Sequence, residues 1–452
     1  MEFPRLPRGF VFGTSTASYQ IEGAWDEDGK GPSIWDTFTA TPGKIKDGSD
    51  GRDACDHYHR HADDVALMKE LGATGYRFSI SWPRVQPDGT GPANEAGLDF
   101  YDRLVDELVD AGIEPMATLF HWDLPQAMQT PSSGGGGGWQ DRATAERFAE
   151  YAALCAERLA DRVGKWAPVN EPNVVTLLGH GIGDHAPGLA LGFDAVPVAH
   201  HLNLAHGLAV LALRAHGARE VGTATNHAPV WPASEEQADL DAAELFDALW
   251  NRIFGDPVLL GRYPVGGGID WAELMPVQDG DLETIAQPLD FYGFNYYNPM
   301  RVGAAAEGAE VPFEFHDITG YPLTDFGWPV VPEGLREVIG QIRERYPHVP
   351  PLHLTENGCS YATGPDEHGV VDDQARIDYL DAHLHAVADA VADGADVRGY
   401  WCWSLLDNFE WAEGYAQRFG LVHVDFETMK RTPKRSFEWY AELIREHRRQ
   451  HP

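Results

Sequence analysis

Two glutamates stand where strand-like segments give way to turn-forming residues. Glu171 lies in the sequence VNEP at 169–172, and Glu356 lies in LTENG at 354–358. Two carboxyl groups that face each other across a sugar can hydrolyse a glycosidic bond, one as acid and base and the other as nucleophile. One such glutamate alone is more often a surface residue at a turn. Two of them, each beside an asparagine in the same register, favour chemistry at a shared site.

Tryptophans gather near the ends of the same strand-like segments, next to polar residues. Sugar rings have apolar C–H faces and a rim of hydroxyl groups, so a sugar site needs aromatic platforms flanked by polar side chains. Any single tryptophan is as readily explained by core packing, where its large ring is buried. The tryptophans concerned are Trp82, Trp122, Trp328, Trp401, Trp403 and Trp411.

Short β-prone runs alternate with longer amphipathic runs, and these elements must position the site. The strand-like runs are 10–16, 73–80, 114–120, 165–170, 221–226, 290–295, 352–356 and 397–404. The helical runs are 57–71, 99–112, 141–163, 196–217, 238–254, 333–345, 372–393 and 433–448. Strands that are each followed by a helix predict an α/β fold, a single (β/α)8 TIM barrel over residues 1–452. Its active site is expected at the C-terminal ends of the strands.

Composition narrows the class of protein. The 452 residues include 34 Lys+Arg and 70 Asp+Glu, a net charge of −36. This excess of anions repels phosphate backbones, so we expect no nucleic-acid partner. The sequence has no run of about 18 apolar residues and begins without the apolar stretch of a secretory signal, so we expect no membrane span and a cytoplasmic location. The acidity fits either a solvated acidic surface or adaptation to salt.

Weaker patterns do not point to a metal or a cofactor. His57 and His61 lie one helical turn apart and could bind a metal, but the same stretch also fits an ordinary helix start. The glycine run 134–138 lacks the GK[ST] ending of a phosphate-binding loop and is expected to be a flexible surface loop. The four cysteines are too few and too scattered for a disulfide framework or a zinc site.

Five separated motifs resemble glycoside hydrolase family 1, the β-glucosidase-type retaining glycosidases, over essentially the full length. They are FVFGTSTASYQIEGA at 10–24, RFSISWPR at 77–84, NEP at 170–172, TENG at 355–358 and the segment 403–411. The resemblance implies a retaining β-glucosidase that acts on a small-molecule β-glycoside through a covalent glycosyl-enzyme. Its expected substrates are disaccharides, short oligosaccharides and aryl or alkyl glycosides with a terminal glucosyl residue. It implies no cofactor and no metal, and it leaves open whether the chain forms a homo-oligomer.

The resemblance also implies roles for individual residues. Glu356 would be the nucleophile and Glu171 the acid/base, with Arg77 and Tyr297 holding the nucleophile's carboxylate and Asn295 supporting the site. A cation and a hydroxyl donor would keep Glu356 ionised, while nearby negative charge would keep Glu171 protonated. The residues implied in substrate binding are Gln20, His121, Trp122, Asn170, Tyr297, Trp328, Trp403, Glu410, Trp411 and Phe419.

One position departs from the family, and two other functions are compatible with the fold. Pro168 stands where the family usually has threonine, and since proline cannot donate to a sheet, the fourth strand is expected to be bulged or shortened near its end. A 6-phospho-β-glycosidase would have the same fold, but such members have Ser, Lys and Tyr at three positions of the eighth-strand loop, where this chain has Glu410, Gln417 and Phe419. A non-catalytic sugar-binding relative would lack a carboxylate. The sequence leaves glucose, galactose and fucose open for the first subsite.

Overall fold

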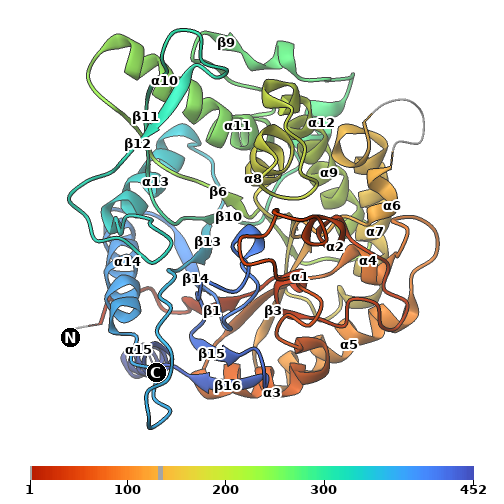
Figure 1. The fold of residues 1–452 in the computed structure, drawn as a ribbon, viewed down its shortest axis with the longest axis vertical. Coiled ribbons are helices and arrows are strands. Elements are labelled where there is room, and N and C mark those ends of the chain that lie inside the picture. Colours follow the sequence, from red (N-terminus) through yellow and green to blue (C-terminus); the bar gives the residue numbers. More distant parts are fainter. Residues whose placement is uncertain (1–2, 131–135, 452) are drawn as a thin grey trace.

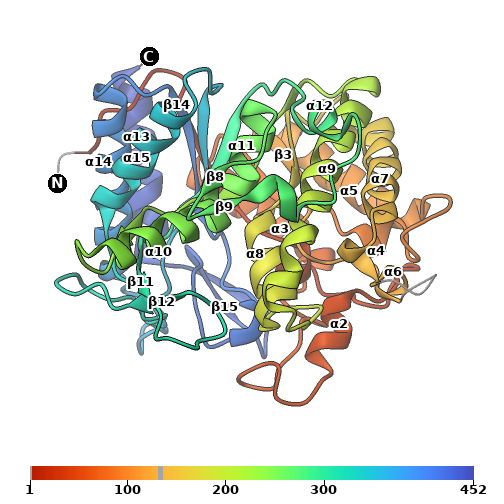
Figure 2. The same ribbon diagram turned by 90° about the horizontal axis from the view of Figure 1, so that it is seen from above.

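The computed structural model describes residues 3–130 and 136–451, with parallel strands at its centre and helices around them (Figures 1 and 2). The central strands are β1 (Val11–Ser15), β2 (Gly75–Ser79), β3 (Glu114–Phe120), β4 (Lys165–Val169), β5 (Glu220–Val221), β6 (Thr225–Asn226), β10 (Tyr292–Asn295), β13 (Leu352–Asn357) and β14 (Val397–Trp403). Their hydrogen-bonded order is β5-β4-β3-β2-β1-β14-β13-β10-β6.

The segment 220–226 closes this sheet into a barrel. Its first part, β5, pairs with β4, and its second part, β6, pairs with β10, so the two ends of the sheet are one strand. Backbone bonds continue between them, since Gly222 N donates to Trp166 O at 2.9 Å and Glu171 N donates to Ala224 O at 2.8 Å. The predicted (β/α)8 barrel is therefore confirmed, with β5 and β6 together as the fifth strand.

The fourth strand carries an irregularity on one side only. β4 keeps a single register with β3 through Pro168 up to Val169, so on that side it is neither bulged nor shortened. Toward the fifth strand, Trp166 pairs with Val221 and Asn170 pairs with Ala224. The three residues 167–169 therefore lie opposite only the two residues 222–223, which is a bulge. The prediction of a bulge near Pro168 is thus confirmed on the side of the fifth strand and wrong on the side of β3.

Helices follow the strands and cover the outside of the barrel, as Figure 2 shows. They are α3 (His57–Leu71), α5 (Glu95–Asp110), α7 (Ala143–Leu159), α9 (Val196–Ala215), α10 (Gln237–Asp247), α11 (Ile253–Leu260), α13 (Pro332–Arg345), α14 (Gln374–Ala392) and α15 (Arg435–Gln450). The expected helix 238–254 is divided, because a π-helical turn at Ala248–Arg252 separates α10 from α11. The stretch Gly192–Ala215 is long and apolar enough to cross a membrane, but 78% of its most apolar window is buried inside the protein, so it packs as a core helix.

Additional elements lie in the connections between the barrel strands and their helices. A three-stranded sheet joins β7 (Val230–Pro232), β11 (Met300–Ala304) and β12 (Phe313–His316), and a π-helix covers Val175–Ile182. The other strands are β8 (Val265–Gly266), β9 (Ile269–Asp270), β15 (Val422–Asp425) and β16 (Lys430–Pro433). The short helices are α1 (Ser18–Ile21), α2 (Ile34–Thr39), α4 (Trp82–Val85), α6 (Gln126–Gln129), α8 (Pro172–Val174) and α12 (Asp281–Ile285). Of the glycine run 134–138 expected to be a loop, Gly134 and Gly135 lie outside the described residues, Gly136 and Gly137 are in neither a helix nor a strand, and Gly138 is buried and begins the 3-10 turn Gly138–Gln140.

Candidate active site

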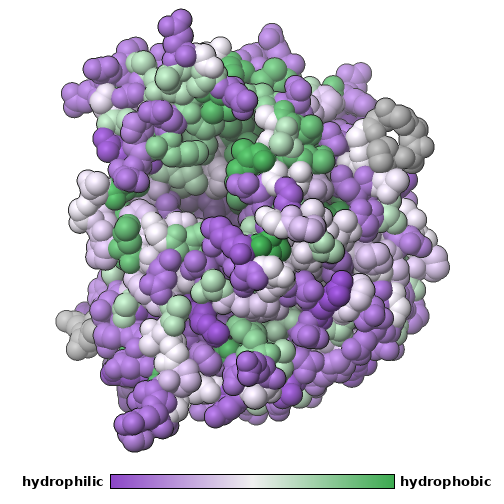
Figure 3. All heavy atoms as spheres, in the orientation of Figure 1, coloured by the Kyte–Doolittle hydropathy of each residue, from purple (hydrophilic) through white to green (hydrophobic). Residues whose placement is uncertain are grey.

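A cavity of about 980 Å³ opens at the C-terminal ends of the barrel strands and is visible as a hollow in Figure 3. Many of the residues expected at the site line it: His121, Trp122, Glu171, Tyr297, Trp328, Glu356, Trp403, Glu410, Trp411 and Phe419. Four others lie buried directly behind this lining: Gln20, Arg77, Asn170 and Asn295. The structure therefore brings together all the expected site residues, although they are spread over more than 390 positions of sequence. Trp82 and Trp401, by contrast, are fully buried core residues.

Glu356 lies near the end of β13 and is held from two sides. Arg77 reaches from β2, and its Nη1 donates to Glu356 Oε1 at 2.5 Å. The hydroxyl of Tyr297 donates to Glu356 Oε2 at 2.8 Å. Burial raises the pKa of Glu356, and the Arg77 cation and the Tyr297 hydroxyl oppose this rise because both stabilise the carboxylate.

Glu171 follows β4 with a left-handed backbone, φ 44°, and has a different environment. Its Oε1 accepts hydrogen bonds from Asn295 Nδ2 at 2.8 Å and from Asn226 Nδ2 at 2.9 Å. Burial, and second the negative charge of Glu356, raise the pKa of Glu171 to about 8. The expectation named nearby negative charge as the cause, but burial is the larger one. Sequence reasoning missed Asn226, although it ends its strand as Asn170 and Asn295 do.

Asn170 sets the protonation of a neighbouring histidine. Its Oδ1 accepts from Arg77 Nη2 at 2.6 Å and from Asn295 Nδ2 at 3.1 Å, which fixes the orientation of the amide. Asn170 Nδ2 therefore donates to His121 Nε2 at 3.1 Å, and the ring proton of His121 lies on Nδ1. Burial holds the pKa of His121 well below its usual value, so the ring is neutral. Within the described residues Nδ1 has no partner, which leaves it free to donate to a ligand hydroxyl.

Gln20 and Glu410 form a second polar group in the cavity. Gln20 Nε2 donates to Phe409 O at 2.9 Å and to Glu410 Oε2 at 3.3 Å. Its Oε1 is buried and, among the described residues, accepts no hydrogen bond. Burial and the charge of Glu356 raise the pKa of Glu410 to about 8. Glu410 and Glu171 can therefore both hold a proton near neutral pH, which limits the negative charge in the empty cavity.

Aromatic rings form two groups around these polar residues. Trp403 and Trp411 both lie nearly parallel to His121, with ring centroids 5.7 and 5.9 Å from it. Near Glu356, the ring centroid of Trp328 lies 5.3 Å from that of Tyr297 and 6.1 Å from that of Phe419. Apolar faces next to hydroxyl-binding groups fit a sugar ring.

The chain matches known glycosidases over nearly its whole length. The family model described as Glycosyl hydrolase family 1 matches residues 3–449. The chain belongs to this family. A β-glucosidase from Agrobacterium sp. is 47% identical, with 97% of this chain and 95% of that protein covered. A bifunctional β-D-glucosidase/β-D-fucosidase from Bifidobacterium breve is 44% identical, with 98% of each covered.

Solved structures of similar sequence have the same fold. Virulence factor SghA from Agrobacterium tumefaciens, solved with its substrate analog salicin, has a TM-score of 0.92 and 47% identity, covering 97% of this chain and 96% of that one. Because Glu171 and Glu356 are both present in one cavity, the expectation of a glycoside hydrolase holds, and this family 1 chain keeps the carboxyl pair that a non-catalytic relative would lack.

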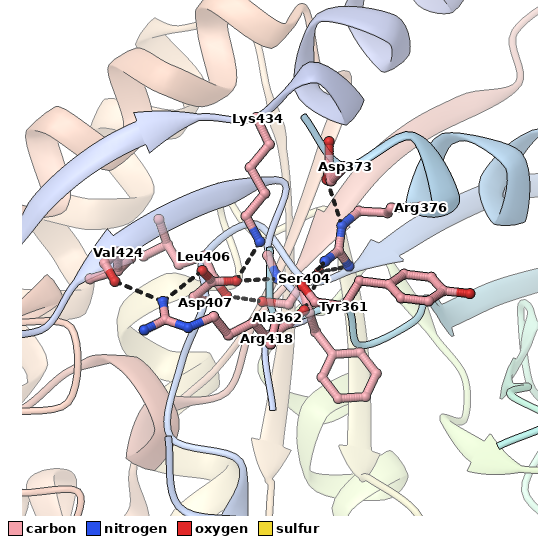
Figure 4. A network of polar contacts seen from close by, with 12 residues as sticks. Tyr361, Ala362, Asp373, Arg376, Ser404, Leu406, Asp407, Arg418, Val424 and Lys434 are labelled. Atoms are coloured by element: carbon pink, nitrogen blue, oxygen red, sulfur yellow. Dashed lines mark hydrogen bonds and ion pairs between the residues drawn. The ribbon is translucent and has the colours of Figure 1, made fainter. Parts of the chain in front are cut away.

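A buried charge network lies behind the eighth-strand loop of this family 1 enzyme (Figure 4). Asp407 accepts from Lys434 Nζ at 2.7 Å, from Arg418 Nη1 at 3.0 Å and from Gly420 N at 3.0 Å. Burial lowers the pKa of Lys434 to about 8, and the two cations hold the pKa of Asp407 below its usual value. The network thereby fixes the loop that carries Glu410.

Arg376 on α14 connects this loop to the segment that follows β13. It pairs with Asp373 at 2.8 Å and donates to the carbonyl oxygens of four residues. The acceptors are Cys359, just after β13, together with Tyr361, Arg418 and Phe419. The segments that follow Glu356 and Glu410 therefore share one buried guanidinium.

The histidine pair noted in the sequence is divided between two carboxylates. His57 Nδ1 contacts Asp64 Oδ2 at 2.8 Å in the interior, and His61 Nδ1 contacts Glu107 Oε2 at 2.7 Å. Across residues 3–130 and 136–451, no group of three or more His, Cys, Asp or Glu side chains is arranged to hold a metal ion.

Proposed function

We propose that the protein is a retaining β-glucosidase that works by double displacement. Its substrates are disaccharides, short oligosaccharides and aryl or alkyl glycosides, from which it removes the terminal non-reducing β-D-glucosyl residue. The observation that carries this proposal is the unequal environment of the two carboxyl groups. Glu356 contacts a cation and a hydroxyl donor, whereas Glu171 is buried among amide groups with its pKa raised to about 8.

In the first step, the Glu356 carboxylate attacks the anomeric carbon as the glycosidic bond breaks. Glu171 gives its proton to the departing oxygen, so the leaving group departs as an alcohol. Arg77 and Tyr297 keep Glu356 ionised before attack. In this mechanism Asn170 would bind the sugar's 2-hydroxyl, where hydrogen bonds strengthen in the transition state. The contacts of its amide with Arg77 and Asn295 support this role because they fix its orientation.

In the second step, Glu171 takes a proton from water, and the water oxygen displaces Glu356 from the anomeric carbon. Two inversions give net retention. An inverting enzyme needs a gap of roughly 6.5–9.5 Å between its carboxyl groups to hold the attacking water. Here the side chain of Asn295 interacts with both carboxyl groups, which supports the closer spacing of a retaining pair.

Leaving-group dependence and external azide separate the two roles. Glu356→Ala alone should not turn over any β-glucoside. With azide and a dinitrophenyl β-glucoside, it should form the α-glucosyl azide. Glu171→Ala should still release dinitrophenol from the β-glucoside, lose activity strongly on alkyl glucosides, and give the β-glucosyl azide. Glu438→Ala, at an exposed position of α15, is the matched control and should behave as the wild type. Azides of the same configuration from both variants would refute the assignment.

A further inference from the structure

Three phenylalanine rings form a cluster at the wall of the catalytic cavity. Phe246 comes from α10, and Phe313 and Phe315 come from β12. The ring centroid of Phe246 lies 5.1 Å from the centroids of both other rings, and the centroids of Phe313 and Phe315 are 5.8 Å apart. All three rings line the cavity, and Phe315 is 61% exposed to solvent. The barrel core does not need an aromatic side chain at this exposed position.

Two hydrogen bonds place this cluster relative to Glu171. Trp250 packs parallel to Phe246 at 5.9 Å, and its Nε1 donates to Asn226 Oδ1 at 3.2 Å. Asn226 Nδ2 in turn donates to Glu171 Oε1 at 2.9 Å. The residue that protonates the departing oxygen must face the leaving group. The cluster is therefore on the leaving-group side of the cavity, reached from Glu171 through Asn226 and Trp250.

Further apolar residues line the cavity from the loop after β4. Leu177, Leu178 and Ile182 belong to the π-helix, and Ile182 is 56% exposed. Figure 3 shows hydrophobic residues along the rim of the hollow. A second sugar in this region would need partners for its hydroxyl groups, whereas apolar surface is stabilised by an apolar ligand that removes it from water.

We propose that Phe246, Phe313 and Phe315, with the π-helix residues, form a binding site for an extended apolar aglycone such as an alkyl chain or fused aromatic rings. The natural substrate class is then glucosides of apolar alcohols or phenols, in preference to glucose-terminated oligosaccharides. This inference rests on the proposed β-glucosidase activity, because the glucosyl unit positions the aglycone at Glu171.

Ethyl, butyl and hexyl β-D-glucosides test this site, because their leaving alcohols have similar acidity and differ mainly in apolar length. Complete removal of one methylene from water strengthens binding about fourfold. With the chain partly enclosed, kcat/KM should rise at least about tenfold from ethyl to hexyl glucoside, mainly through KM. Phe315→Ser should reduce this hexyl-to-ethyl ratio to about threefold or less. Leu211→Ser, a 43% exposed position on α9 away from the cavity lining, should keep the wild-type ratio.

The possible outcomes separate the two proposals. Three results would each overturn the apolar site and leave the β-glucosidase activity standing. They are equal kcat/KM for all three glucosides, a hexyl-to-ethyl ratio that Phe315→Ser leaves unchanged, and a higher kcat/KM for cellobiose than for hexyl glucoside. Failure to hydrolyse any β-glucoside, including the p-nitrophenyl glucoside, would overturn both. A rising series that collapses in Phe315→Ser but not in Leu211→Ser supports the apolar site.

Discussion

Replacing Tyr297 by phenylalanine removes one hydrogen bond to Glu356, the proposed nucleophile, and little else. The hydroxyl donates to Glu356 Oε2 at 2.8 Å, and burial with nearby carboxylates raises the pKa of Tyr297 well above its usual value, so the group stays a donor. A hydrogen bond to a charged group contributes about 1.5–3 kcal/mol. At about 1.36 kcal/mol per pKa unit, its loss should raise the pKa of Glu356 by ~1–2 units.

The consequence is a shift of the acidic limb of the pH profile. Because Glu356 acts as the carboxylate, a higher pKa removes activity on the acid side, so this limb of kcat/KM should move up by ~1–2 pH units. The 2,4-dinitrophenyl β-glucoside isolates this limb, since its leaving group needs no proton from Glu171. Tyr321→Phe is the control: it removes a similar bond to Glu333, at 2.6 Å, on the exposed surface. An acidic limb that stays in place in Tyr297→Phe would refute the reasoning.

Three further predictions concern specificity and stability. The enzyme should hydrolyse p-nitrophenyl β-glucoside and ignore its 6-phosphate, because Glu410, Gln417 and Phe419 offer no cation to a dianion; comparison of kcat/KM for the two substrates checks this. Asp407→Asn should lower the free energy of unfolding by about 3–5 kcal/mol in urea titrations, since it removes the negative charge that offsets the buried Lys434 cation. Asp396→Asn in an exposed pair should cost at most about 1 kcal/mol. The melting temperature should not fall between about 0.1 and about 1 M NaCl. Over this range the Debye length shrinks from about 10 to about 3 Å, so the self-repulsion of a chain with net charge −36 is screened. A steady fall of the melting temperature would contradict this.

The alternation of strand and helix was enough to predict the barrel, because each element shows its own local periodicity. The helix expected at 57–71 has those bounds in the structure, and the strand expected at 114–120 does as well. The fifth strand was expected as one run, 221–226, and is two short pieces because its pairing changes from β4 to β10 along its length. Such a change of partner leaves no trace in local sequence.

The site was less completely predictable than the barrel. Motifs identified Glu171 and Glu356 because each has its own sequence signature. Asn226 lies in no motif, and its position at the end of a strand does not by itself show a role, which only its bond to Glu171 reveals. The same holds for Phe313 and Phe315, which lie on a strand of four residues, too short for a clear pattern. Their partner Phe246 is about 70 positions away in sequence, and only the folded chain shows that the three rings meet.

The single guanidinium of Arg376 has a consequence for how family 1 specificity can change. It donates to carbonyl oxygens of Cys359 and Tyr361 after one strand and of Arg418 and Phe419 after another, so a replacement loop with a different backbone path would leave a buried cation with fewer acceptors. We therefore expect the two loops to tolerate replacement only as a pair. The β11–β12 hairpin is outside this constraint and can diverge residue by residue, which makes it the natural place for new leaving groups to be accommodated.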